Sequence, residues 1–272
     1  KNRKVHLEKI GFVKTIFDRT IPTDAKFINC TVSKDKVGDF YVSILVEQHI
    51  EHWPKTNKAV GIDVGLKSFA VLSNETVIAN PRHFRENQSK LKRMQQHFAR
   101  KVKGSSHYKQ TRKQVARIHR KTARQRTHFL HKVSTSLVRD FDIIAIEDLN
   151  IAGMMKNHCL AKSIGDVSWS EFYRQLDYKA AWYGKEVRIV NRFEPTSKTC
   201  HVCGYYFKDM TLDIRNWDCP CCGVSHDRDI NAAKTILKQS ATVEAELQAW
   251  RECQSSGKKT EAVPYEVSRI EV

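Results

Sequence analysis

The chain has 272 residues, enough for one or two domains with a buried core. Hydrophobic residues make up 40% of it, and its longest apolar runs, near Phe40–Val46 and Phe141–Ile146, are far shorter than the roughly 20 residues of a membrane-spanning helix. These short runs predict a soluble protein. Since 47 Lys and Arg stand against 30 Asp and Glu, the net charge of +17 predicts a polyanionic partner, nucleic acid first and an anionic membrane surface second.

The N-terminal residues predict a small β-rich piece. Thr31–Ser33 and Phe40–Glu47 are rich in β-branched and aromatic residues, and the turn signal Lys36–Asp39 separates them. This piece could be a purely structural module, since its residues show no reactive spacing. The basic first residues lack the apolar stretch of a secretory signal, so we expect a cytoplasmic protein. Because the chain begins at Lys1 rather than Met, we expect a fragment.

The next apolar runs predict a mixed sheet. Ala59–Asp63, Phe69–Leu72 and Thr76–Ala79 are typical of an antiparallel meander, and further strands are expected at Asp142–Ile146 and Val187–Val190. Helices are expected at Phe172–Tyr183, where an apolar stripe indicates core packing, and at Ile230–Leu237. The predicted fold class is therefore α/β.

Residues 82–139 predict two strongly basic helices, which separate at Gly104–Ser106. The stretch holds 18 Lys and Arg and a single acid, Glu86. A charged run is often only a solvated face, but an all-positive face repels itself, which favours contact with nucleic acid. The candidate contacts are Lys92, Arg93, Arg100, Lys101, Lys103, Lys109, Arg112, Lys113, Arg117, Arg120, Lys121, Arg124 and Arg126.

Paired cysteines predict a zinc site. Cys200 and Cys203 form one C-x-x-C pair, and Cys219 and Cys222 form a second one. Two such turns on a two-stranded ribbon can supply the four ligands of a tetrahedral zinc ion. The spacing therefore favours zinc binding in a reducing compartment over disulfide bonds. A register that uses Cys221 in place of Cys222 stays open, as does the choice between a purely stabilising ribbon and one that also touches nucleic acid.

Three carboxylates could form a catalytic centre. Asp63 and Glu147 each end a buried-strand pattern, and Asp229 precedes the last predicted helix. Taken singly, Asp63 could be an ordinary turn residue, Glu147 a strand-end acid and Asp229 a helix N-cap. Their order along the chain, with an acid after each of two strands and one before a helix, is that of the ribonuclease H architecture. Together they could hold two divalent ions, magnesium or manganese, for phosphodiester cleavage. Asp148 and Asp227 are rival candidates.

Four segments together resemble the TnpB/OrfB proteins of bacterial insertion sequences. They are Val60–Gly65 (VGIDVG), Ile144–Leu149 (IAIEDL), Thr196–Gly204 (TSKTCHVCG) and Cys219–Ala233 (CPCCGVSHDRDINAA). As a set these motifs are specific, because three RuvC carboxylate motifs enclose a zinc ribbon between the second and the third. The resemblance covers about residues 8–237.

The resemblance implies a RuvC (RNase H-like) nuclease, often called a transposase and related to type V CRISPR effectors. It implies that Asp63, Glu147 and Asp229 are the catalytic acids and that the four paired cysteines hold structural zinc. It further implies that a guide RNA directs DNA cleavage. The domains expected from this are a remnant β-rich module (1–57), the core (58–199) with the basic insertion (82–139), the ribbon (200–224), the last core segment (225–238) and a tail (239–272).

The chain departs from the family in its short N-terminal region, because few residues precede Asp63 and a helical recognition lobe is missing. We therefore expect a shortened copy in which guided targeting is weakened. Two alternatives stay open. One is a nucleic-acid-binding protein without activity, and the other is a strand-transferring transposase, which would use the same carboxylates and metal ions.

Overall fold

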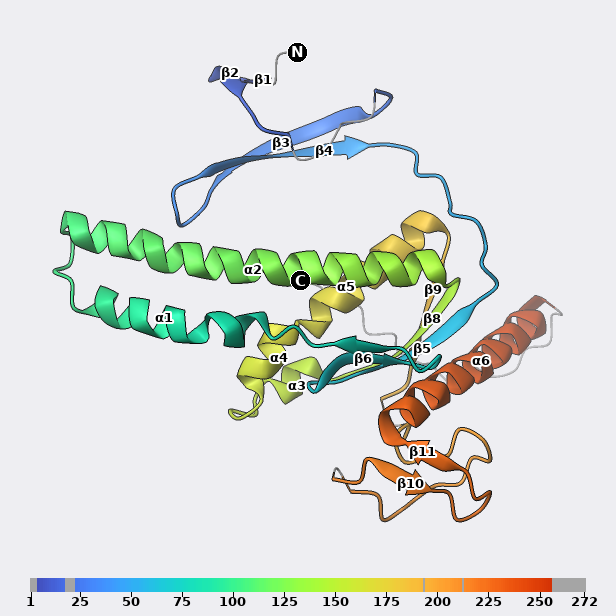
Figure 1. Ribbon diagram of the computed structural model, residues 1–272. Coiled ribbons are helices and arrows are strands. Elements are labelled where there is room, and N and C mark those ends of the chain that lie inside the picture. The colour runs from blue at the N-terminus through green and yellow to red at the C-terminus, as the bar shows by residue number, and fades with distance from the viewer. Residues whose placement is uncertain (1–3, 18–22, 193, 212, 256–272) are drawn as a thin grey trace. The chain divides into compact units, whose positions relative to one another are not determined.

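The computed structural model describes residues 4–17, 23–192, 194–211 and 213–255 (Figure 1). The chain divides into two compact units. The hairpin unit comprises Lys1–Glu51 and Ser89–Lys121, and the sheet unit comprises His52–Gln88 and Thr122–Val272. Within the described residues, no helix has both the length and the apolar character needed to cross a membrane.

The hairpin unit contains two antiparallel pairs, β1 (Lys4–Leu7) with β2 (Gly11–Lys14) and β3 (Lys26–Lys34) with β4 (Phe40–Glu47). The strands predicted around Lys36–Asp39 are thus confirmed. One carboxylate oxygen of Asp35 accepts hydrogen bonds from the backbone N–H groups of the next turn, at 2.8 to 3.0 Å. The turn includes Gly38, whose φ of +109° is a conformation that L side chains rarely adopt.

The sheet unit is built on a five-stranded mixed sheet with the order β7-β6-β5-β8-β9. Its strands are β5 (Ala59–Val64), β6 (Ser68–Leu72), β7 (Val77–Ala79), β8 (Ile143–Glu147) and β9 (Glu186–Val190). The first three form the predicted antiparallel meander, whereas β5, β8 and β9 run parallel to one another. Strands β5 and β8 are buried along most of their length, which explains their continuous apolar runs.

Six helices lie in the described residues. They are α1 (His83–Ala99), α2 (Ser106–Asp140), α3 (Ile151–Met154), α4 (Ala161–Val167), α5 (Trp169–Tyr183) and α6 (Arg228–Ser255). The predicted break between the basic helices is confirmed. The expected final helix is also present, although α6 continues well past Leu237.

Helices cover both faces of the sheet. On one face, Phe172 and Leu176 of α5 and Leu137 of α2 pack with the side chains of β5 and β8 in the main core. On the other face, α6 places Ile236 against Ala145 of β8. The alternation of side chains along the two central strands therefore fixes which helix covers which face (Figure 1).

Gly61 lets α6 approach β5 closely. A Cβ atom at this position would lie 2.1 Å from the carbonyl oxygen of Ala233 and 2.8 Å from the backbone nitrogen of Leu237. Both atoms belong to the backbone of α6, so neither can move without shifting the helix. Since α6 begins at Arg228, its placement also determines where Asp229 lies.

We therefore expect Gly61→Ala to lower the free energy of unfolding by about 3 kcal/mol, because it overpacks a contact between a helix and a strand. Gly165→Ala is the matched control, since its added Cβ would meet only the Cε atom of Met155, at 3.8 Å, inside helix α4. This control should be neutral or slightly stabilising. Urea unfolding of both variants measures the difference, and equal stabilities would contradict the close approach.

Candidate functional site

Asp63 and Glu147 lie side by side at one edge of the sheet. In the parallel pairing of β5 with β8, Ile62 is opposite Ile146, and each carboxylate comes one position later. Asp229 lies in the first turn of α6, the helix that packs on these strands. The three predicted acids thus come from two adjacent strand ends and one helix start.

The charges of the other two carboxylates act on Asp63. Burial, followed by the charges of Asp229 and Glu147, raises the pKa of Asp63 from 3.8 to about 8, against the opposing effects of two arginines. Burial also raises the pKa of Glu147, while a hydrogen bond from the Thr196 hydroxyl at 3.4 Å acts in the other direction. A site that disfavours its own negative charge in this way attracts a cation.

Two arginines neutralise Asp229. Its carboxylate lies 3.1 Å from the guanidinium of Arg215, which belongs to the cysteine-rich segment, and 3.2 Å from that of Arg228. The sequence analysis did not single out either arginine. The position of Arg215 between the two cysteine pairs was the signal available.

The rival acids are occupied elsewhere. One oxygen of Asp227 accepts hydrogen bonds from the backbone N–H groups of Asp229 and Ile230, both at 3.0 Å, so Asp227 is the N-cap of α6. Asp148 accepts hydrogen bonds from the Arg192 guanidinium at 2.5 and 2.8 Å. These contacts leave Asp229 as the acid of α6 that faces Asp63.

Asp63 and Asp229 line a cavity of about 550 Å³. Its wall combines the loop after β5, the start of α6 and the cysteine-rich segment, and it carries the positive charges of Lys67, Lys198 and Arg215. A cavity lined by both carboxylates and cations can accept a divalent ion together with a phosphodiester. Oxygen ligands of this kind suit magnesium or manganese.

The four cysteines of the predicted zinc set converge. The sulfur atoms of Cys200, Cys203, Cys219 and Cys222 all lie within 4.8 Å of one another, so the register uses Cys222 rather than Cys221. Within the described ranges, no other group of His, Cys, Asp or Glu comes together this closely, and the three carboxylates are spaced more widely. The short antiparallel strands β10 (Asn216–Asp218) and β11 (Ser225–Asp227) connect this cluster to α6.

The chemistry of the cysteine cluster favours a metal ion. Burial opposes ionisation of Cys219, but hydrogen bonds from the backbone N–H groups of Cys222 and Cys221 lower its pKa to about 7. The imidazole Nε2 of His226 lies 3.1 Å from the Cys200 sulfur. Four converging sulfurs, one of which accepts thiolate-stabilising hydrogen bonds from two backbone N–H groups, fit zinc. The sequence analysis missed His226, although it lies only four residues after Cys222.

Asn231 of α6 connects the helix to the first cysteine turn. Its side-chain oxygen accepts a hydrogen bond from the backbone N–H of His201 at 3.0 Å, and its side-chain nitrogen donates to the carbonyl of Thr199 at 2.8 Å. Asn231 is buried. The helix that carries Asp229 and the turn that carries Cys200 are therefore held together.

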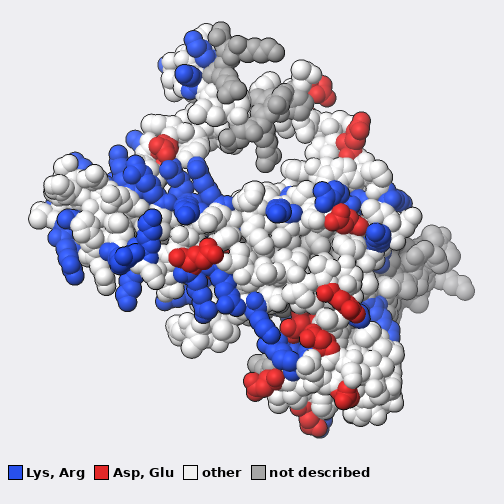
Figure 2. Space-filling model, in the orientation of Figure 1, with Lys and Arg blue, Asp and Glu red and all other residues white. Residues whose placement is uncertain are grey.

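Most of the predicted nucleic-acid contacts are exposed, and Figure 2 shows Lys and Arg gathered over α1 and the N-terminal part of α2. Two of the candidates form internal ion pairs instead. Within the hairpin unit, Arg120 binds Asp35 at 2.6 Å and also binds Asp39. Within the sheet unit, Arg126 lies 3.4 Å from Asp166. Lys101 is half-buried.

Comparison with known proteins identifies relatives over most of the chain. Residues 42–158 match the OrfB_IS605 family, described as "Probable transposase", and residues 169–236 match the "Cas12f1-like, TNB domain" family. A "Putative RNA-guided DNA endonuclease" of Streptomyces pristinaespiralis is 42% identical over 81% of this chain and 55% of its own length. The "Putative RNA-guided DNA endonuclease InsQ" of Escherichia coli K12 is 32% identical over 87% of this chain and 62% of its own.

Among solved structures, a chain of a CRISPR-Cas12f ternary complex aligns with a TM-score of 0.51 and 21% identity, over 73% of this chain and 41% of that one. This similarity concerns the fold. The chain spans 55% and 62% of the lengths of the two relatives named above. The chain thus consists of an OrfB_IS605 segment followed by a Cas12f1-like TNB segment, and it is homologous to curated proteins named putative RNA-guided DNA endonucleases.

Proposed function

We propose that this protein is a metal-dependent, RNA-guided DNA endonuclease with Asp63, Glu147 and Asp229 as its catalytic acids. The observation that carries the proposal is the placement of these acids at two adjacent strand ends and one helix start, where burial and mutual repulsion raise the pKa of Asp63 to about 8. Residues 58–199 and 225–238 would form an RNase H-like (RuvC) core, with a zinc ribbon at 200–224.

The chain's own groups suit this chemistry. The three carboxylates would hold magnesium or manganese, which when bound activates water and stabilises charge on the phosphate oxygens. Lys67, Lys198 and Arg215 line the same cavity and would attract a phosphodiester. Thr196 donates a hydrogen bond to Glu147 and so orients this carboxylate.

The proposal of a guide RNA and a DNA target rests on the relatives, whose names describe RNA-guided DNA endonucleases. The exposed cations of α1 and α2 support it, because a surface of one sign binds a polyanionic backbone. Binding through several phosphates should weaken steeply as salt rises.

The test is cleavage of labelled single- and double-stranded DNA by the purified protein, with and without co-expressed RNA, in magnesium or in EDTA. We expect magnesium-dependent hydrolysis that RNA directs to a complementary site and that Asp63→Asn abolishes. Salt-sensitive binding without cleavage under any of these conditions would instead identify a binding protein. Joined rather than cut products would identify strand transfer.

A further inference from the structure

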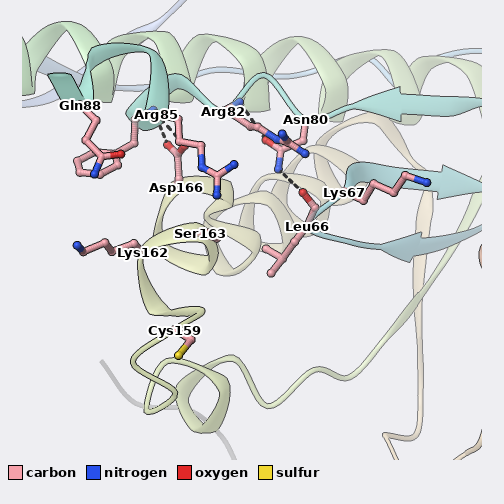
Figure 3. A pocket seen from close by; sticks show the side chains of 11 residues that line it. Leu66, Lys67, Asn80, Arg82, Arg85, Gln88, Cys159, Lys162, Ser163 and Asp166 are labelled. Carbon is pink, nitrogen blue, oxygen red and sulfur yellow. Dashed lines mark hydrogen bonds between the residues drawn. The ribbon is translucent and has the colours of Figure 1, made fainter. Parts of the chain in front are cut away.

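A second cavity lies beside the carboxylate cleft in the sheet unit. Its volume is about 400 Å³, within the range of sites that hold small molecules. The loop after β5, the first turn of α1 and helix α4 form its wall (Figure 3). Arg85 points from α1 toward α4, and Lys162 and Ser163 belong to α4.

The cavity is strongly positive. Lys67, Arg82, Arg85 and Lys162 line it, and within the described residues their side chains have no ion-pair partner. The acid in the wall, Asp166, is engaged. Its carboxylate accepts hydrogen bonds from the backbone N–H of Phe84 at 3.0 and 3.1 Å, and it pairs with Arg126 at 3.4 Å.

The positive charge of the cavity is therefore not compensated by the acid in its wall. Arg126 offsets the charge of Asp166, so the remaining cations have no counter-charge on the wall. Four uncompensated cations around a cavity attract an anion of more than one charge.

The second cavity continues from the cleft that holds the acids. Leu66 and Lys67, which follow Asp63 by three and four residues, line both cavities. The side-chain nitrogen of Asn80 donates to the Leu66 carbonyl at 2.9 Å and so holds this loop in place. Lys67 points away from the other labelled side chains in Figure 3, which fits its place on the boundary.

We infer, on the basis of the proposed nuclease function, that this cavity is a subsite for one nucleotide of the single DNA strand that enters the cleft. Arg82, Arg85 and Lys162 bind the phosphates that flank this nucleotide. Leu66 and Phe84, which also line the cavity, offer apolar surface to its base. A subsite next to the acids would fix which phosphodiester lies over them.

Cys159 provides a direct readout, because this exposed thiol also lines the cavity. The 272-residue protein is alkylated with N-ethylmaleimide without added magnesium, so that no cleavage occurs and bound zinc is retained, and mass spectrometry follows each cysteine. With oligodeoxythymidine of about 12 nucleotides at about ten times its Kd, alkylation of Cys159 should slow about tenfold, because the reagent reaches only free protein. Exposed Cys30, in the hairpin unit, is the internal reference.

The double variant Arg85→Gln/Lys162→Gln should remove the protection and lower the slope of log Kd against log salt by about 1.4, or about 0.7 for each phosphate contact. Arg139→Gln/Arg174→Gln is the control with equal charge loss. These arginines are exposed and pair with Asp140 at 3.2 Å and Glu171 at 2.8 Å. The control should keep the protection.

Bound DNA that leaves the alkylation rate of Cys159 unchanged would overturn the subsite. Protection by an RNA oligonucleotide but not by DNA would also overturn it, since the occupant would then be RNA. If DNA protects Cys159 but no condition gives cleavage, the subsite is supported and the proposed nuclease activity alone fails. Far-UV circular dichroism of both double variants confirms that they fold.

Discussion

Asp63→Asn is expected to abolish cleavage and, at the same time, to make the protein more stable. Since Asp63 is proposed to hold a metal ion, its replacement should remove several kcal/mol of transition-state stabilisation, and the cleavage rate should fall by roughly a thousandfold or more. Stability should rise because the amide has nearly the same shape but needs no buried charge. Function and stability thus oppose each other at this residue.

The sign of the stability change follows from the pKa of Asp63, which rises from the ordinary aspartate value of 3.8 to about 8 in the folded protein. Below about pH 4 both states bind the proton and the two proteins should be equally stable. Between pH 4 and 8 the unfolded chain releases the proton while the fold retains it, so the wild type loses stability as the pH rises. At pH 7 we expect Asp63→Asn to gain about 4 kcal/mol, or roughly 8–16 °C in Tm.

Thermal unfolding in EDTA at pH 4 and pH 7 measures this gain. Asp177→Asn is the control, since this carboxylate is exposed on α5, and it should change stability at neither pH. Adding magnesium should stabilise the wild type but not Asp63→Asn, and so narrow the difference between them. A wild type that is the more stable protein at pH 7 in EDTA would contradict the electrostatic account of the site.

Cys222→Ser is expected to remove zinc and, with it, the ordered ribbon. A four-sulfur site contributes about 10 kcal/mol or more to the folding of its segment, and the loss of one ligand removes most of this. Because Asn231 and Arg215 connect the ribbon to the start of α6, cleavage should fall by at least about tenfold. Zinc content by mass spectrometry and limited proteolysis of residues 200–224 measure the first effect, and the DNA assay measures the second.

Cys221→Ser is the matched control, since it removes the thiol next to Cys222 that lies outside the cluster. It should keep one zinc ion, a protected ribbon and full activity. The opposite outcome, with zinc lost in Cys221→Ser and retained in Cys222→Ser, would show that the metal uses the other register. Equal loss of zinc in both variants would show that zinc binding does not distinguish Cys222 from Cys221.

The sequence predicted the central strands well because their burial on both faces leaves a direct trace of continuous apolar residues. Ala59–Asp63 and Asp142–Ile146 lie within one residue of β5 and β8. The positions of Asp63 and Glu147 followed, since parallel strands end at the same edge. The cysteine spacing was equally informative, because a metal site imposes local geometry.

Ion pairs between residues far apart in the chain leave no such pattern in the sequence. Nothing in the basic run marks Arg120 as a partner of Asp35, or Arg126 as a partner of Asp166, because those acids are far away in the chain. The choice between Asp227 and Asp229 depends on which carboxylate turns toward the helix N–H groups. The sequence does not reveal the positive cavity for the same reason, because three segments that are separate in the chain form it.

The two hydrogen bonds of Asn231 restrict which residues the fold can accept at this position. Its amide uses its oxygen and its nitrogen at once, toward the N–H of His201 and the carbonyl of Thr199. Aspartate, of equal size, would set an oxygen against the Thr199 carbonyl. Leucine would leave the His201 N–H unpaired, and the Thr199 carbonyl would keep only the hydrogen bond from the Thr235 hydroxyl, at 3.2 Å. The shape of the cysteine turn thus dictates the residue two positions after Asp229, so substitutions in the cysteine-rich segment and at the start of α6 cannot accumulate independently.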